Sequence, residues 1–451
     1  MKIKYLVVVL MLCCGCKKYL DGKTDKSLVQ PATLADAQAL LDNYTQMNTF
    51  YPSIAAESED DHFLLPASLL SLPTTLQDNY TWATGAFFST SDVSWKFLYN
   101  NILAANMALE TVGKNARTPQ NAADYDYIRG QALFFRAFAL FYAAEYFAAP
   151  YDSAAAATTP GIPLRLTSDV NEPVTRPSLK ECYDRIYTDL QEACTLLPDT
   201  RDHLSRPNRA AAWALLARVA LTMADYATAL DAANKSLAGY NTLEDYNTVD
   251  SFAATPFKSL GPEVTFHAEA LQNRAIFSPT AKTDTVLYAS YDDNDLRKHL
   301  YFYASGGGYH SFKGSYAGSN YYDVPFIGLA TDEQYLIAAE CYARLGQTAK
   351  ALEMLNTLLV NRWQAGKFHP FTAGNAEDAL RLVLEHRRKE LAGRGMRWLD
   401  LRRLNLDKRF AVTLTRVVNA AVITLPPGDP RYTFYIPDIV VKTSGLSQNQ
   451  R

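Results

Sequence analysis

Cysteine, net charge and long apolar runs are all scarce in this 451-residue sequence. Three of the 6 cysteines fall within the first 16 residues, and only Cys182, Cys194 and Cys341 follow. Cys182 and Cys194 are twelve residues apart in a segment with a helical pattern, a separation of about 18 Å along a helix. This is beyond disulfide reach, so the three are predicted to be buried apolar residues.

Several functional classes are also disfavoured by what is missing. A formal net charge of −3 offers no general attraction for nucleic acid, so no nucleic-acid partner is expected. The 7 histidines show no metal-ligand spacing, no G-x-S-x-G motif is present, and "GGGYHSFKGS" lacks the order of a phosphate-binding loop. Among 47 acidic residues nothing selects a pair for glycoside hydrolysis. We therefore expect no catalytic residue, no metal and no cofactor.

The N-terminus has the features of an export signal. Lys2 and Lys4 precede an apolar run that ends at Gly15, which has the length of a signal-peptide core and is too short to span a bilayer. The run ends in "LCCGCKK", where Gly15-Cys16 resembles the lipobox of bacterial lipoproteins, although Cys13 stands where that motif has Leu. Residues 1–15 are predicted to be a signal peptide, and residues 16–32 a tether lipidated at Cys16.

Helical patterns dominate most of the remaining chain. A helix is expected after Thr33, a suitable cap, and others after Ser94 and around Ile128, whereas residues 51–92 read as mostly irregular. No later apolar stretch is long enough to cross a membrane. The predicted regions are residues 33–238, a helical region; residues 239–330, an irregular lobe; and residues 331–451, a C-terminal helical region.

Two segments have the pattern of closely packed helix hairpins. Ala217 and Ala229 are twelve residues apart across a turn, and Ala339 and Ala351 repeat this spacing with Gly346 between them. Small residues at these offsets let antiparallel helices approach closely, and Gly346 can end a helix in a left-handed conformation. Both segments resemble the tetratricopeptide repeat. They are 122 residues apart, so a large insertion separates them.

The insertion is rich in aromatic residues. Nine of the 26 residues from Tyr301 to Phe326 are aromatic, and five glycines interrupt any regular pattern. A helical scaffold with such an irregular segment is typical of a platform that presents a binding site.

Five stretches together resemble the SusD/RagB family of surface lipoproteins. They are "CKKYLDGKTDKSLV", "SWKFLYNNILAANMAL", "GQALFFRAFALFYAAEYF", "LEHRRKELAGRGMRWLDLRRLN" and "FYIPDIVVKTSGLSQNQ". The resemblance covers nearly the whole mature chain. It implies a mainly α fold, with four tetratricopeptide-like helix pairs as a scaffold and an irregular, loop-rich ligand-binding lobe.

The resemblance also implies a role. Members of this family act as lids over a TonB-dependent outer-membrane transporter of the SusC/RagA type. We therefore expect a non-catalytic lipoprotein, anchored on the outer membrane and exposed at the cell surface, that binds an oligosaccharide or polysaccharide and delivers it to such a transporter. Two alternatives are the same role with oligopeptides as cargo, as the RagB branch implies, and a surface glycosidase.

Sugar recognition requires flat aromatic faces flanked by polar groups. Two stretches supply them: "ESEDDHF…DNYTWATGAFF" and the tyrosine-rich segment. The predicted ligand-binding residues are Asp60, Asp61, Tyr80, Trp82, Tyr309, Asn320, Tyr321 and Tyr322. For each aromatic residue among them, packing of the ring against the helices is an equally good explanation. The arginines between positions 387 and 403 alternate with acidic residues and are instead expected to form structural ion pairs.

Overall fold

Helices account for most of the secondary structure in this computed structural model, which describes residues 31–84, 88–200, 203–271, 274–277, 280–318 and 324–451. The expectation of a mainly α fold is therefore confirmed. Throughout the described residues, no helix combines the length and apolar character needed to span a membrane. Cys182, Cys194 and Cys341 are free and buried, as expected.

The first part of the chain begins with short helices and continues with long ones. Thr33 caps the first described helix in a capping box with Asp36, which confirms the predicted cap. Residues 51–92, expected to be mostly irregular, instead contain three short helices, too short to produce a recognisable periodic pattern. The helices are α3 (Leu34–Leu41), α4 (Tyr44–Met47), α5 (Ile54–Ser58), α6 (Pro66–Leu70), α7 (Thr74–Thr81), α8 (Phe88–Lys114), α9 (Ala122–Phe147), α10 (Leu179–Leu196), α11 (Arg209–Thr222) and α12 (Tyr226–Gly239).

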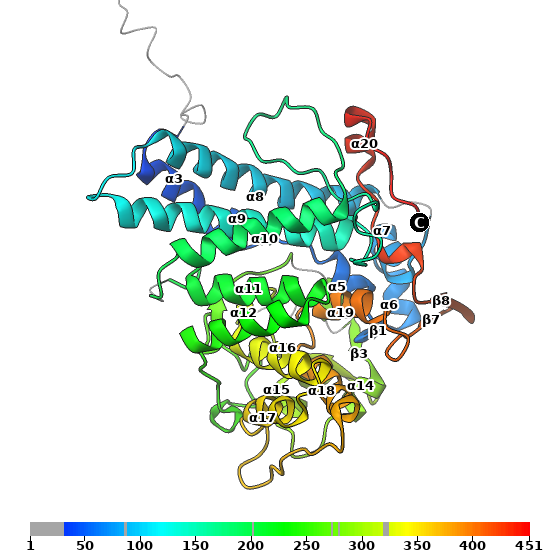
Figure 1. The fold of residues 1–451 in the computed structure, drawn as a ribbon. Coiled ribbons are helices and arrows are strands. Elements are labelled where there is room, and N and C mark those ends of the chain that lie inside the picture. The colour runs from blue at the N-terminus through cyan, green and yellow to red at the C-terminus, as the bar shows by residue number, and fades with distance from the viewer. Residues whose placement is uncertain (1–30, 85–87, 201–202, 272–273, 278–279, 319–323) are drawn as a thin grey trace, which may run out of the picture.

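The long helices pack against one another in chain order. Helix α8 packs on α9, α9 on α10, α10 on α11 and α11 on α12. The array continues with α16 (Thr331–Arg344), which packs on α12 and also contacts α17 (Thr348–Leu359) and α18 (Ala376–Glu390). Figure 1 shows this stack running from the blue and cyan helices at the top to the yellow helices at the bottom.

Both predicted helix hairpins are present. They are α11 with α12 and α16 with α17, and the four alanines at positions 217, 229, 339 and 351 are fully buried. Gly346 lies between α16 and α17 with a φ of 77°, the left-handed conformation expected for it. The close helix approach follows from the absence of side-chain bulk at these positions.

The segment between α12 and α16 consists of short elements with a core of their own. The elements are η3 (Tyr246–Thr248), β2 (Val264–Phe266), α13 (Arg274–Phe277), β3 (Ala281–Thr283), α14 (Thr285–Ala289), α15 (Arg297–Leu300), β4 (Phe302–Ala304), β5 (His310–Phe312) and β6 (Leu329–Ala330). The antiparallel pairs are β2 with β6, β4 with β5, and β3 with β1 (His62–Leu64). Five aromatic residues of the tyrosine-rich stretch are buried in this core: Tyr301, Phe302, Phe312, Tyr316 and Phe326.

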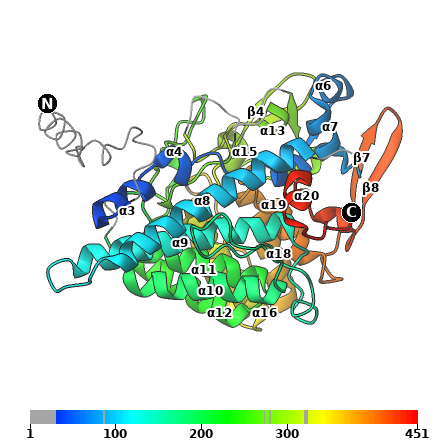
Figure 2. The same ribbon diagram turned by 90° about the horizontal axis from the view of Figure 1, so that it is seen from above.

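The C-terminal region adds a hairpin that the sequence analysis did not identify. After α19 (Met396–Leu404) come β7 (Leu414–Val418) and β8 (Ala421–Leu425), which pair antiparallel, then η4 (Pro430–Tyr432) and α20 (Asp438–Ser444). Asn419 and Ala420 form the two-residue turn with positive φ angles. Figure 2 shows this hairpin projecting from the end of the molecule near α6 and α7.

The arginines between positions 387 and 403 form structural ion pairs, as expected. Nε of Arg387 lies 2.8 Å from Asp400, and Nη1 of Arg403 lies 2.6 Å from Glu340 on α16. Arg402 is buried and donates to the backbone carbonyl groups of Tyr432 and Ala148. These contacts join α18 and α19 to the helix array and to the C-terminal segment.

Candidate functional site

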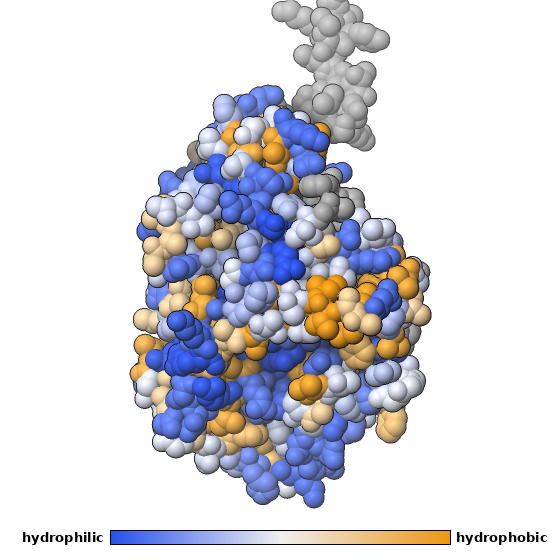
Figure 3. Space-filling model, turned by 90° about the vertical axis from the view of Figure 1, so that its right-hand side faces the viewer, coloured by the Kyte–Doolittle hydropathy of each residue, from blue (hydrophilic) through white to orange (hydrophobic). Residues whose placement is uncertain are grey.

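A cleft that contains three of the predicted site residues lies between the β7–β8 hairpin and the irregular lobe. It has a volume of about 720 Å³, and Asp60, Tyr80 and Tyr309 line it. Residues 413–417 form one wall, and the start of α14 with β1 forms the other. Figure 3 views the side of the molecule that carries the hairpin, where hydrophilic and apolar side chains are interspersed. A cleft of this size suits a small ligand or part of a longer one.

Arginines from two helices hold the acidic side chains of the cleft. The Asp60 carboxylate accepts hydrogen bonds from Nε of Arg397 at 2.6 Å and from Nη2 of Arg388 at 3.3 Å. Asp61 accepts from Nε of Arg388 at 2.8 Å and lies mainly behind the cleft surface. The side chains of Asp60 and Arg388 each remain 25% exposed, which leaves polar atoms within reach of a ligand.

Neighbouring charges and burial shift the pKa values of Asp60 and Glu59 in opposite directions. Burial acts to raise the pKa of Asp60, but the guanidinium groups of Arg397 and Arg388 outweigh it and hold that pKa well below its ordinary value. Burial, together with the negative charges of Asp61 and Asp60, raises the pKa of neighbouring Glu59 far above its usual range. The ionised form of Asp60 is therefore favoured, whereas burial favours the protonated form of its neighbour Glu59.

Tyr80 and Trp82 are held by Arg416, which the sequence analysis did not single out. The Arg416 guanidinium lies 4.0 Å from the centre of the Tyr80 ring and 5.1 Å from that of Trp82. Its nitrogens also donate to the backbone carbonyl groups of His62, Glu59 and Tyr80. The base of the hairpin is thereby fixed to the segment that contains β1.

Trp82 occupies a position different from the one expected of a ligand-stacking ring. Its side chain has no exposed surface, and its Nε1 donates to the carbonyl oxygen of Ser58 at 2.9 Å. The ring is therefore part of the core and cannot contact a ligand in this conformation. Tyr80 is 4% exposed, and its hydroxyl accepts a hydrogen bond from the Leu64 amide, so only its edge reaches the cleft.

Tyr309 presents the more accessible ring. It follows three glycines, at positions 306, 307 and 308, which all have positive φ angles and form the tight connection between β4 and β5. Its ring meets that of Phe63 edge to face, with centroids 5.4 Å apart. Both side chains are half-buried and line the cleft, so they form an aromatic surface beside the Asp60–Arg397 ion pair.

The remaining predicted site residues lie outside the described part of the chain. They are Asn320, Tyr321 and Tyr322 and the predicted lipidation site Cys16. The assignment of these residues stays a prediction.

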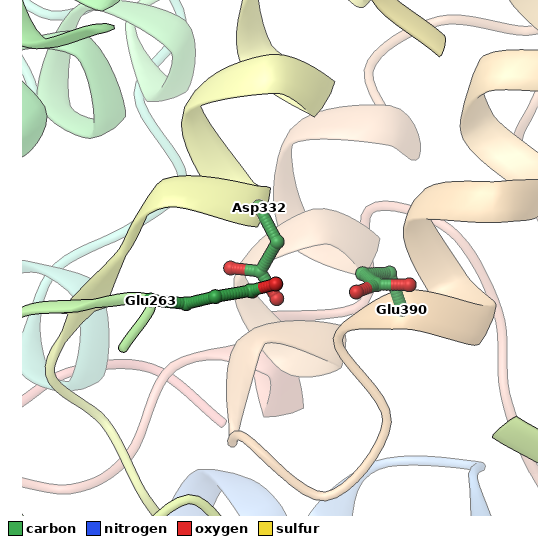
Figure 4. A group of neighbouring side chains, drawn as sticks. All are labelled: Glu263, Asp332 and Glu390. Carbon is green, nitrogen blue, oxygen red and sulfur yellow. The ribbon is translucent and has the colours of Figure 1, made fainter. Parts of the chain in front are cut away.

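Three buried carboxylates elsewhere have the geometry of a possible metal site. Oxygen atoms of Glu263, Asp332 and Glu390 all lie within 4.8 Å of one another, and Figure 4 shows the three side chains converging. Arginines already occupy these oxygens, however. Glu263 accepts from Arg362 at 2.8 Å, Glu390 from Arg297 at 2.7 Å and Asp332 from Arg394 at 2.6 Å. The three carboxylates and their arginines therefore form a charge-compensated ion-pair network, which joins the lobe to α16 and α18.

Several cleft residues were missed by the sequence analysis. Phe63 belongs to the quoted stretch "ESEDDHF" but was not selected, and Val286 and Thr415 come from segments without an aromatic signal. The alternation in "LTRVVNAAVITL", with a short turn at its centre, could have identified the hairpin that forms one wall. Arg388 and Arg397 were recognised as ion-pairing residues, but their acidic partners are far away in the sequence.

Two family models match consecutive parts of this chain. Residues 18–221 match the model described as "Starch-binding associating with outer membrane". Residues 263–416 match the model described as "SusD family". A curated relative, "SusD-like protein P2" of Formosa agariphila, is 24% identical over 380 residues, covering 69% of this chain and 71% of the relative.

Solved structures share the fold across almost the whole chain. A SusD superfamily protein from Bacteroides thetaiotaomicron aligns with a TM-score of 0.75 at 19% identity, covering 93% of this chain and 100% of that one. A SusD-like carbohydrate binding protein from Bacteroides vulgatus aligns with a TM-score of 0.71 at 20% identity, covering 92% and 97%. These likenesses establish the fold.

Replacing Trp82 should reduce stability. We expect Trp82→Ala to lower the free energy of unfolding by about 3–5 kcal/mol, because it removes a fully buried ring and a hydrogen bond. Denaturant unfolding measures this loss. The matched control is Trp213→Ala, since Trp213 is only half-buried, on α11, and should cost less. Equal stability of Trp82→Ala and the wild-type protein would place this ring outside the core.

The carboxylate network should make stability depend on pH. Burial, with the nearby charges of Asp332 and Glu390, raises the pKa of Glu263 to about 7, although Arg362 opposes the shift. Because the folded pKa is raised above the ordinary 4.5, this stabilisation is complete below about pH 4.5 and is lost as the pH rises through about 7. Melting temperatures across this range should fall less steeply for Glu263→Gln than for the wild-type protein. Parallel profiles would contradict the assignment.

Proposed function

Because the chain belongs to the SusD/RagB family, we propose that it is a non-catalytic surface lipoprotein that binds an extracellular oligosaccharide or polysaccharide and delivers it to a SusC-like TonB-dependent outer-membrane transporter. The observation that carries the binding role is the cleft beside the hairpin. It combines the half-buried rings of Tyr309 and Phe63 with the hydrogen-bonding groups of Asp60, Arg388 and Arg397. Aromatic surface with a few fixed polar groups is the usual composition of a small-ligand site.

Comparison with named relatives supports sugar as the ligand class. The model that matches residues 18–221 is described as starch-binding, and one structural neighbour is named a carbohydrate binding protein. In the cleft, the ring faces would pack against the C–H surface of a sugar, and the paired carboxylate and guanidinium groups would bind its hydroxyl groups.

The ionised state of the Asp60 carboxylate favours a binding role over a catalytic one. A glycosidase needs one carboxylic acid with a raised pKa beside the scissile bond. Asp60 is instead held ionised by Arg397 and Arg388, and buried Glu59, whose pKa is raised, does not line the cleft. Asp284, the other acidic residue of the cleft, caps α14 by accepting a hydrogen bond from the Leu287 amide. The acids of the cleft thus have structural partners.

The family match also supports a location at the outer membrane. The first matching family model is described as associating with the outer membrane. The proposed attachment is a lipid on Cys16 after removal of residues 1–15, with the protein exposed at the cell surface. Several acyl chains on one residue hold a protein at a membrane far more firmly than one chain.

Tyr309→Ala should weaken sugar binding at least about fivefold and leave the melting temperature nearly unchanged, because the ring is half-buried on a loop. Isothermal titration calorimetry would follow a screen of a broad glycan panel. Tyr44→Ala is the control, since Tyr44 is 40% exposed and does not line the cleft. Absence of binding to every glycan in the panel, or equal loss in both variants, would contradict the proposed site.

Cys16→Ser should move the protein from the membrane fraction to the soluble fraction, because the lipid attachment site is lost. Fractionation of cells followed by immunoblotting measures this, with Cys182→Ser as the control because Cys182 is a buried structural residue. Retention of Cys16→Ser in the membrane fraction would show that another feature anchors the chain.

A further inference from the structure

A second cavity adjoins the cleft on the side away from the hairpin. It has a volume of about 280 Å³ and lies between α14, α18 and the segment that follows α19. Four residues line both cavities: Val286, Arg388, Arg397 and Val412. The two cavities therefore adjoin; together they are called the groove below, and its centre is the place where they meet at Arg388 and Arg397.

The centre of this groove presents no unpaired charge. Arg388 lies 2.8 Å from Asp61 and 4.0 Å from Asp284, and Arg397 lies 2.6 Å from Asp60. A carboxylate-bearing ligand would have to compete with these aspartates for the guanidinium groups. A hydroxyl group needs no such exchange, because it can donate to a paired carboxylate and accept from a remaining guanidinium N–H.

The second cavity repeats the mixture of apolar and polar groups found in the cleft. Leu384, Leu404 and Phe410 supply apolar surface, and Ser290 supplies a hydroxyl group at the end of α14. The guanidinium groups of Arg381 and Arg409 lie 5.3 and 5.1 Å from the centre of the Phe410 ring. The charged residues Glu385 and Lys389 pair with each other.

Arg416, the remaining charged residue that lines the groove, also has hydrogen-bond partners within the protein. Arg416 is 5% exposed, and its donors are directed to backbone carbonyl groups. His62 is neutral, since burial and the neighbouring Arg416 lower its pKa to about 3. The groove as a whole is thus lined by compensated charges, hydroxyl groups and apolar surface, which suits an uncharged ligand.

We infer that the second cavity is an additional subsite, and that the ligand is a neutral oligosaccharide long enough to cross the Arg388–Arg397 centre and occupy both cavities. This inference rests on the proposed sugar-binding function. The cleft beside the hairpin binds one part of the chain, and the cavity beside Phe410 binds the next. Affinity then increases with chain length until both cavities are filled.

The test is calorimetric titration of the full mature protein with neutral oligosaccharides, from disaccharides to octasaccharides, of the linkage selected in the glycan screen. Long oligomers should bind about tenfold more tightly than the shortest one that binds. Ser290→Trp fills the second cavity from an exposed position, so it should abolish this gain and leave the short oligomer unaffected. Phe410→Ala should reduce the gain in the same direction.

The matched control is Ser71→Trp, because Ser71 is also an exposed residue at the end of a short helix with its hydroxyl on a backbone carbonyl, and it lines neither cavity. Circular dichroism melting checks that each variant folds. Equal affinity for short and long oligomers, or a length gain that persists in Ser290→Trp, would overturn the subsite and leave the proposed function standing.

Two further outcomes are decisive. Tighter binding of uronate-bearing or sulfated oligomers than of neutral ones would overturn the neutral ligand class. Binding of extended peptides with no binding of any glycan would overturn both the inference and the sugar-binding function.

Discussion

The candidate site depends on the pairing of Arg388 and Arg397 with Asp60 and Asp61. Asp61 lies 327 residues before Arg388 in the chain, and Asp60 lies 337 residues before Arg397. The pairs also share members, since Arg388 contacts both Asp60 and Asp61, so removing one side chain would leave the largely buried charges that remain less well compensated. The N-terminal segment and helices α18 and α19 are therefore held in one relative position, and the floor of the cleft is formed where they meet.

Ion pairs also fix distant segments relative to one another in the network of Glu263, Asp332 and Glu390. Here Arg362 contacts both Glu263 and Glu390, and thereby connects the irregular lobe to α18. Replacing buried ion pairs by apolar residues is often neutral for stability, so their contribution is better understood as fixing which segments meet. The lobe has few long elements of its own, and directional charge pairs position it on the helix array.

Much of the scaffold could be predicted from local patterns. The alanine spacing and Gly346 identified both helix hairpins, because close helix packing requires small residues at fixed offsets. The arginines near the C-terminus were correctly expected to be structural, since acidic residues alternate with them. The partners of Arg388 and Arg397 could not be predicted, because Asp60 and Asp61 are distant in sequence and no local pattern specifies such a contact.

The residues of the candidate site were less predictable, because most of them lie in segments without a periodic pattern. In a regular helix, periodicity separates buried from exposed rings, but the irregular segments have no period. Tyr301 and Tyr316 are buried, whereas Tyr309 is half-buried at the cleft, and nothing in the surrounding letters distinguishes them. Trp82 looked suitable for ligand stacking because its neighbours are polar, yet Arg416 and the Ser58 carbonyl satisfy it inside the protein.

Arg416 also explains how an exposed hairpin can form one wall of the cleft. Its contacts with the carbonyl groups of Glu59, His62 and Tyr80 fix the base of β7, while the turn at Asn419 and Ala420 remains exposed. A two-stranded hairpin alone is marginally stable in water, so this anchoring sets the position of residues 413–416. The width of the cleft at the hairpin is therefore determined by the core that holds Trp82.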